Sequence, residues 1–208
     1  MALTTLDPTC ALVVIDLQKG IVSARTGPPV TAAVRQAAQL AGGFRRHGLP
    51  VVLVNVTGRA PGRTDAGRTE AGRTDAGRTE AGRTEAGRSG IGAALPDGWA
   101  DLIDELDVRP TDHLITKRRR SAFHDTGLDT LLRDLGVTQV VLAGIATGSG
   151  VESTARAAAD HGYHVVLATD AMTDPDADAH RHSVARVFPK LGETTTTAEV
   201  LDMMEATR

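Results

Sequence analysis

Aromatic residues are nearly absent from this chain of 208 residues, which has one Trp, one Tyr and three Phe. Its core must therefore be built mainly from Val, Leu, Ile and Ala, which suits parallel strands that are buried on both faces. Cysteine is scarcer still, because Cys10 stands alone. A single cysteine excludes an internal disulfide and favours a reducing, cytoplasmic location.

Long apolar runs are also missing, and none approaches the roughly 18–20 residues that span a bilayer. The first ten residues, MALTTLDPTC, contain neither the basic region nor the apolar region of a signal peptide. The net charge of -3 offers no general excess of positive charge for phosphate backbones. We therefore expect no membrane and no nucleic acid among the partners.

The apolar residues that are present alternate between short β-branched runs and helical spacing. This alternation indicates βαβ units with right-handed crossovers. We predict one domain over residues 1–208, with a three-layer α/β/α, doubly wound, Rossmann-like fold around a roughly six-stranded parallel sheet. The predicted strands cover residues 10–17, 50–56, 112–117, 137–145, 163–169 and 194–197. The predicted helices cover residues 31–47, 99–106, 127–135, 151–161, 178–187 and 198–204.

Residues 58–90 interrupt this alternation after the second predicted strand. They repeat the unit A-G-R-T-[D/E] with a period of five residues. That period matches neither a helix nor a strand, so no continuous apolar face can form. With a glycine and paired charges in each unit, the segment is predicted to be a solvated, mobile insertion. The alternative is a lid whose first arginines, Arg59 or Arg63, reach an anionic substrate.

Residues 140–160, VVLAGIATGSGVESTARAAAD, predict a buried strand, a turn of small residues over 146–150 and then a helix. The N–H groups at the start of such a helix lie at its positive end and attract anions. In open α/β sheets, ligands bind at this carboxyl edge of the strands. The turn is therefore the predicted centre of a functional site.

Two other predicted strands end in charged residues, Asp16 and Lys117. Each has an ordinary explanation by itself: Asp16 could cap the following loop, and Lys117 with the three arginines after it could be a solvated basic patch. Parallel strands share a direction, however, so their carboxyl ends meet at one edge of the sheet. We expect Asp16, Lys117 and the turn to converge there.

Together these segments resemble the isochorismatase-like hydrolases, a superfamily that includes nicotinamidases and N-carbamoylsarcosine amidohydrolases. The resemblance rests on VVIDLQ, TKRRRSAF, VVLAGIATGSGVESTARAA and VVLATDAMTD. It implies homo-oligomers of two or more subunits and, in most members, an Asp–Lys–Cys triad. The triad positions in this sequence are Asp16, Lys117 and Gly150, and a cis peptide is implied between Ile145 and Ala146.

Glycine at position 150 removes the thiolate on which amide hydrolysis through such a triad depends. Cys10 cannot replace it, because six strand residues at about 3.3 Å each place it roughly 20 Å from Asp16. Ser149 would need a different turn geometry and a base. Covalent catalysis by a thiol is therefore excluded.

True isochorismatases also have glycine at this position, and their K-x-R-x-S-A-F segment matches residues 117–123 here. The resemblance then implies hydrolysis of a vinyl ether, which needs no covalent intermediate. Asp16 would be the general acid, while Lys117 orients it and binds a substrate carboxylate. Gly150 would leave room for substrate or water.

These motifs predict a small anionic substrate and no metal or other cofactor. The sequence NVTGR after the second predicted strand offers no Asp/His cluster. His180 and His182 lie two residues apart on a predicted helix, face different ways and are expected on the surface. The candidate substrate contacts are Gln18, Arg119, Phe123, Ala146, Thr147 and Ser149.

Two other functions stay open beside acid-catalysed hydrolysis. One is a small-molecule-binding relative that kept the pocket and lost its nucleophile. The other is an amidase in which Asp16 activates water as the direct nucleophile. Retention of both Asp16 and Lys117 favours an enzyme, because buried charges are tolerated mainly where they have a role.

Overall fold

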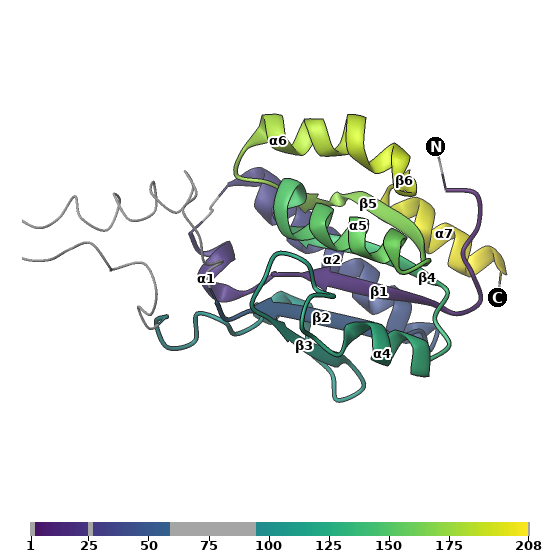
Figure 1. The fold of residues 1–208 in the computed structure, drawn as a ribbon, viewed down its shortest axis with the longest axis horizontal. Helices are drawn as coiled ribbons and strands as arrows, with labels where there is room; N and C mark the ends of the chain where they lie inside the picture. The colour runs from purple at the N-terminus through teal and green to yellow at the C-terminus, as the bar shows by residue number, and fades with distance from the viewer. Residues whose placement is uncertain (1–2, 25–26, 59–94, 208) are drawn as a thin grey trace, which may run out of the picture.

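The computed structural model describes residues 3–24, 27–58 and 95–207 of the chain. The predicted insertion over residues 58–90 lies outside these residues, apart from Gly58. Within them, parallel strands form one six-stranded sheet with helices on both faces (Figure 1). The predicted three-layer α/β fold is confirmed.

The strand order is β3-β2-β1-β4-β5-β6, and every neighbouring pair is parallel. The direction of winding reverses between β1 and β4, because the chain builds outward to β3 on one side and to β6 on the other. In doubly wound sheets, ligands bind at such a reversal, beyond the carboxyl ends of the strands. The strands comprise Cys10–Ile15 (β1), Val51–Val56 (β2), His113–Lys117 (β3), Gln139–Ile145 (β4), His164–Thr173 (β5) and Glu193–Thr195 (β6).

Alternate side chains of the strands contribute to two cores, one on each face of the sheet. On β1, Leu12 and Val14 belong to the core beneath α2 and α7, whereas Val13 and Ile15 belong to the core beneath α4 and α5. All four are buried, as expected of a central parallel strand covered on both faces. The helices comprise Lys19–Val22 (α1), Pro28–Arg46 (α2), Leu128–Asp134 (α4), Glu152–Asp160 (α5), Ala177–His182 (α6) and Thr197–Thr207 (α7).

The start of α7 follows from a reciprocal cap in the sequence. The Glu199 N–H donates to the Thr196 hydroxyl at 3.3 Å, and the Thr196 N–H donates to the Glu199 carboxylate at 2.9 Å. This is the capping-box arrangement. Hydrogen bonds from Thr195 and Thr196 hold the pKa of Glu199 below its usual range.

The predicted helix over residues 99–106 is wrong. Only Asp104–Leu106 is helical, as a short 3-10 turn. Leu102 instead pairs with Gln18 in an antiparallel bridge, and neighbouring backbone groups bond to the stretch that follows β1. We call residues 97–103 the strap, because they lie across the end of β1.

Other element boundaries differ in smaller ways. Helix α1 has four residues and was not predicted. Strand β5 continues to Thr173, past a register shift opposite β4. The predicted helix over 178–187 divides into α6 and a wider π-helical turn, Ser183–Val187.

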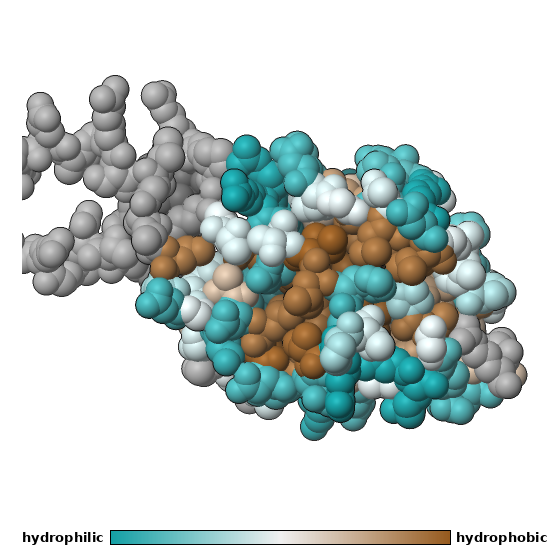
Figure 2. Space-filling view, turned by 90° about the horizontal axis from the view of Figure 1, so that it is seen from below, coloured by the Kyte–Doolittle hydropathy of each residue, from teal (hydrophilic) through white to brown (hydrophobic). Residues whose placement is uncertain are grey.

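The β3 side of the sheet carries exposed apolar side chains (Figure 2). Leu114 on β3 is 63% exposed, and Val108 and Leu135 are also exposed. β3 is the edge strand on this side of the described sheet. None of the described helices is both long and apolar enough to cross a membrane.

Gly144, on β4, should not tolerate a side chain. Its φ is +120°, and an added Cβ would lie 2.0 Å from the carbonyl oxygen of Ile15 on the neighbouring strand. Gly144→Ala is expected to lower the free energy of unfolding by about 3 kcal/mol or more, measured by urea denaturation. Gly127→Ala is the control, because nothing lies within 4 Å of its added Cβ, and we expect a change below about 1 kcal/mol. Equal stabilities for the two variants would contradict this account.

Candidate active site

Asp16 lies directly after β1 and is 5% exposed. Its backbone adopts a left-handed conformation with φ of +54°, which Asp tolerates better than most residues. Its N–H still donates to the Val54 carbonyl of β2 at 2.8 Å. The chain therefore turns sharply at the end of the strand while its backbone stays anchored to the sheet.

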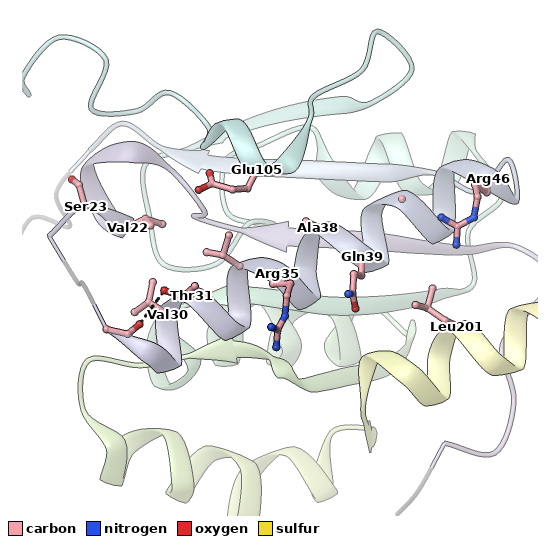
Figure 3. Close-up of a pocket in the computed structure, with 13 residues that line it drawn as sticks. Val22, Ser23, Val30, Thr31, Arg35, Ala38, Gln39, Arg46, Glu105 and Leu201 are labelled. Carbon is pink, nitrogen blue, oxygen red and sulfur yellow. Dashed lines mark hydrogen bonds between the residues drawn. The ribbon is translucent and has the colours of Figure 1, made fainter.

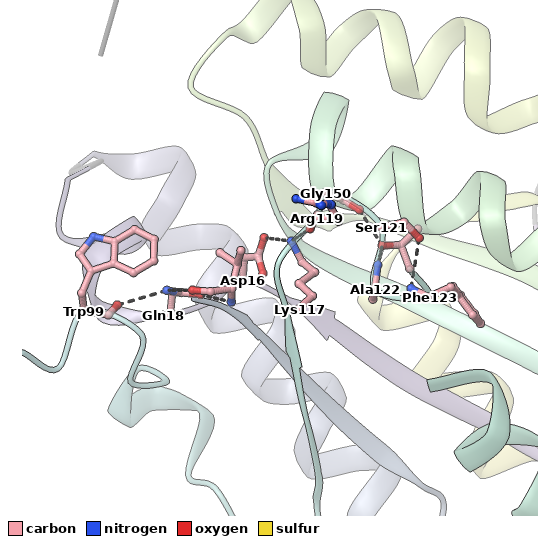
Figure 4. A network of polar contacts seen from close by, with 11 residues as sticks. Asp16, Gln18, Trp99, Lys117, Arg119, Ser121, Ala122, Phe123 and Gly150 are labelled. Atoms are coloured by element: carbon pink, nitrogen blue, oxygen red, sulfur yellow. Dashed lines mark hydrogen bonds and ion pairs between the residues drawn. The ribbon is translucent and has the colours of Figure 1, made fainter. Parts of the chain in front are cut away.

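Lys117 ends β3 and is 2% exposed. Its Nζ lies 2.7 Å from Oδ2 of Asp16 and donates to the Arg119 carbonyl at 3.1 Å (Figure 4). The pair joins strands that are separated by β2. Burying two charges costs several kcal/mol per ion before their attraction is counted, so a buried pair is a weak stabiliser and a candidate functional group.

Gly150 lies in the helical turn Thr147–Val151, between β4 and α5. The Ile145–Ala146 peptide that precedes this turn is cis, as the family resemblance implied. A Cβ added to Gly150 would lie 3.2 Å from Asp16 Oδ2 and 3.0 Å from Ile15 Cγ2. Position 150 thus faces the ion pair, and the three predicted segments converge. Cys10 lies at the opposite end of β1.

The N–H groups of the turn are already bound in part by the protein. The Gly148 N–H donates to Oδ2 of Asp174 at 2.8 Å. The N–H groups of Ser149 and Val151 both donate to the Ala146 carbonyl. A carboxylate of the protein therefore occupies part of the positive end of this helical segment, and a substrate anion would have to compete with it there.

Gln18 has no exposed surface, and its amide is bound by backbone groups. Nε2 donates to the carbonyls of Val56 and Trp99 at 3.1 and 3.2 Å, and Oε1 accepts the Val56 N–H at 2.7 Å. Both amide hydrogens are used in these bonds. The structure thus places Gln18 as a link between β2 and the strap, and it does not bring the amide to a substrate.

Phe123 is not brought to the site either, since Figure 4 shows its ring pointing away from Asp16. The ring stacks on His161 with a centroid distance of 5.0 Å and lies 5.9 Å from the ring of Tyr163. Burial and a hydrogen bond to Asp129 raise the pKa of Tyr163 to about 12. These contacts place the aromatic cluster over α4 and the end of α5, where it supports the loop after β3.

The remaining predicted contacts lie nearer to the pair. Arg119 is exposed and contributes its carbonyl to Lys117. Ala146, directly before the turn, and Ser149 within it are half-buried, and Thr147 is fully buried. The structure therefore brings together all three predicted catalytic residues. Of the six predicted substrate contacts, Thr147 and Ser149 lie in the turn and Ala146 directly precedes it.

His180 was predicted to lie on the surface, and the structure supports this only in part. It is half-buried on α6, and its Nδ1 lies 2.9 Å from Oγ1 of Thr147. His182 is exposed, as predicted. No spacing rule could have found the contact, because it joins residues 33 positions apart.

Trp99 was also missed, although the strap places it beside the end of β1 (Figure 4). A Cβ added to Gly20 would lie 2.0 Å from Cδ1 of the Trp99 ring. The ring therefore packs directly on the backbone of α1. A lone Trp at the start of a predicted helix gave no signal of this contact.

A groove of about 820 Å³ lies elsewhere, along the outer side of α2 (Figure 3). Its lining is mostly apolar and includes Val30, Val34 and Leu201. It contains neither the buried ion pair nor any residue of the Thr147–Val151 turn, so we place the candidate chemistry at Asp16. Within the described parts of the chain, no three His, Cys, Asp or Glu side chains gather as a metal site requires.

Comparison with known proteins adds three findings. The family model of the isochorismatase domain matches residues 10–199. An uncharacterized isochorismatase family protein of Bacillus subtilis is 36% identical over 94% of each chain, and a maleamate amidohydrolase of Pseudomonas putida is 26% identical over 93% of this chain and 86% of its own. The solved structure of an isochorismatase family protein from Burkholderia thailandensis aligns with a TM-score of 0.77 and 38% identity, covering 97% of this chain and 98% of that one.

Gln18 should be needed for stability. Gln18→Met keeps the length of the side chain but leaves three backbone groups without their partner, so the free energy of unfolding should fall by at least about 2 kcal/mol in urea denaturation. Gln18→Glu should cost more, because it also buries a negative charge against the carbonyl oxygens of Val56 and Trp99. Unchanged stability in Gln18→Met would contradict the role of Gln18 as a link.

The packing around position 150 should accommodate glycine better than any residue with a side chain. Gly150→Ala is expected to lower the free energy of unfolding by about 1–3 kcal/mol, because its Cβ would crowd Ile15 and Asp16. Ile15→Leu removes the crowded γ-methyl, so in calorimetry the double variant should lose at least about 0.5 kcal/mol less than the sum of the single losses. Strict additivity would argue against this steric account. Ser149→Ala, which adds no volume beside Asp16, is the control.

Proposed function

Because the chain belongs to the isochorismatase family of hydrolases, we propose that it hydrolyses a small anionic substrate by direct addition of water, with Asp16 transferring the proton. One observation carries the proposal. Oδ2 of Asp16 is 2.7 Å from Lys117 Nζ and 3.2 Å from the point where a side chain at position 150 would begin. The two charged groups are in place, and no nucleophile is attached between them.

The reaction that fits this arrangement best is hydrolysis of a vinyl ether. Asp16 donates a proton to the terminal enol carbon, and the ether oxygen stabilises the resulting oxocarbenium ion. Water adds to the carbon that bears the ether oxygen and returns a proton to Asp16, and the hemiketal then separates into an alcohol and a keto acid. The Lys117 ammonium, 2.7 Å from Oδ2, stabilises the Asp16 carboxylate that the first proton transfer leaves.

We assign binding of the anionic substrate to positively charged side chains. The Gly148 N–H already donates to Asp174. The turn therefore binds a substrate carboxylate more weakly than a helix start with free N–H groups would. Lys117 is buried beside Asp16, and the exposed residues Arg118, Arg119 and Arg120 follow it. In a site sheltered from water, an ammonium attracts a substrate carboxylate more strongly than it would in bulk solvent.

A second candidate reaction is amide hydrolysis with water as the direct nucleophile. It is favoured by the similarity to a protein named maleamate amidohydrolase over most of both chains. In this case Asp16 accepts a proton from water, and the neighbouring Lys117 favours its ionised form. Both reactions use the same pair, and they differ in the direction of the first proton transfer.

The test offers isochorismate, maleamate and further small amides to the wild type and to Asp16→Asn, and follows pyruvate and ammonia. We expect pyruvate from the wild type and a loss of about 10²–10⁴-fold in kcat in the variant. Ammonia lost in the variant would support the amidase instead. Stabilisation of the fold by these compounds without any product would contradict both reactions and indicate a binding protein.

Two further variants make this result interpretable. Asp16→Asn leaves the buried Lys117 without its counter-ion and can destabilise the fold by about 3–5 kcal/mol. The double variant Asp16→Asn/Lys117→Met removes both charges, and its melting temperature should lie above that of Asp16→Asn. Asp104→Asn is the matched control, because Asp104 pairs with Lys19 at 3.0 Å on the surface and should be dispensable.

A further inference from the structure

The turn that contains Gly150 is held from one side by the segment that follows β5. Thr147 has no exposed surface, and its Oγ1 lies 2.9 Å from Nδ1 of His180 on α6. Asp174, just before α6, accepts the Gly148 N–H at 2.8 Å. Both contacts act on the first two residues of the turn.

The packing between α6 and the turn is close. A Cβ added to Gly148 would lie 3.3 Å from Cβ of Ala179 and 3.4 Å from Oγ of Ser183. The Ser183 hydroxyl also donates to Glu152 at 2.6 Å, at the start of α5. The segment from Asp174 to Ser183 thus contacts the chain on both sides of Gly150.

His180 is not needed to build its own helix. Helix α6 already has an N-cap, because the Asp176 carboxylate accepts the N–H groups of Asp178 and Ala179. Among the described residues, the His180 ring forms a side-chain hydrogen bond with Thr147. A buried hydroxyl without an acceptor is costly, and the unprotonated Nδ1 of a neutral imidazole is an acceptor.

We propose that His180 is a positioning residue for the reaction, acting through Thr147 on the turn. The hydrogen bond between the ring and the Thr147 hydroxyl holds the turn so that Gly150 faces Asp16 and Lys117. This inference deepens the proposed function and rests on it for the activity measurements. It assigns to α6 a part in catalysis without contact to substrate.

The activity test uses four variants. His180→Ala and Thr147→Val each remove the contact and should lower kcat about 10–100-fold, with KM changed less than about 3-fold, because the turn is misplaced while Lys117 still binds the substrate. The double variant should be no worse than either single variant. His180→Asn presents an amide oxygen near the place of Nδ1 and should recover most of kcat. His182→Ala, on the same helix and exposed, should match the wild type.

Some outcomes would overturn the proposal. If His180→Ala lowers kcat while Thr147→Val does not, the ring does not act through the hydroxyl. If His180→Asn is as impaired as His180→Ala, filling space on α6 is what matters. Normal kcat in all variants would show that the contact has no part in the reaction.

A measurement without substrate separates this proposal from the proposed function. The amide ¹H–¹⁵N signals of Gly148 and Gly150 should shift in the same direction in His180→Ala and Thr147→Val, and should stay in place in His182→Ala. If the wild type turns over none of the substrates, these shifts still decide whether His180 sets the turn. Unmoved signals in both contact variants would overturn the proposal.

Discussion

The ion pair between Asp16 and Lys117 is the interaction on which the candidate site depends. Two charges are held 2.7 Å apart, almost without exposure, across an intervening strand. The fold can present them because β1 and β3 run parallel and end at the same edge, and because Asp16 turns the chain while its N–H stays bonded to β2. The reversal of winding between β1 and β4 brings the turn to the same place, so that sheet topology supplies the site.

Gly150 limits the chemistry of the candidate site as much as the two charged residues do. The backbone of residue 150 lies so close to Ile15 and Asp16 that one added carbon atom would crowd both. The site is therefore packed for a residue without a side chain. This packing favours a reaction in which the Asp16 carboxyl group transfers protons and water forms the new bond to the substrate.

Much of the fold could be predicted because short β-branched runs and helical spacing are local signals, and parallel strands bring their ends together wherever they lie in the sequence. The convergence of Asp16, Lys117 and the turn that contains Gly150 was predicted in this way. Contacts between distant segments left no such signal. The strap looked helical by spacing, yet Leu102 pairs with Gln18. The surroundings of Gln18, Phe123 and His180 were missed for the same reason. The partners of Gln18 and Phe123 lie at least 38 positions away in the sequence, and the partner of His180 lies 33 positions away.

The amide of Gln18 has an architectural consequence for the five-residue repeat. One side chain binds Val56, where the chain leaves the sheet, and Trp99, where it returns. Asn55 adds a second tie, to the Ala100 carbonyl at 2.9 Å. The exit and the re-entry of the chain are thus fastened to each other independently of the number of units between them. A gene that gained or lost units by slippage would alter the length of the protein while both anchor points stayed as they are.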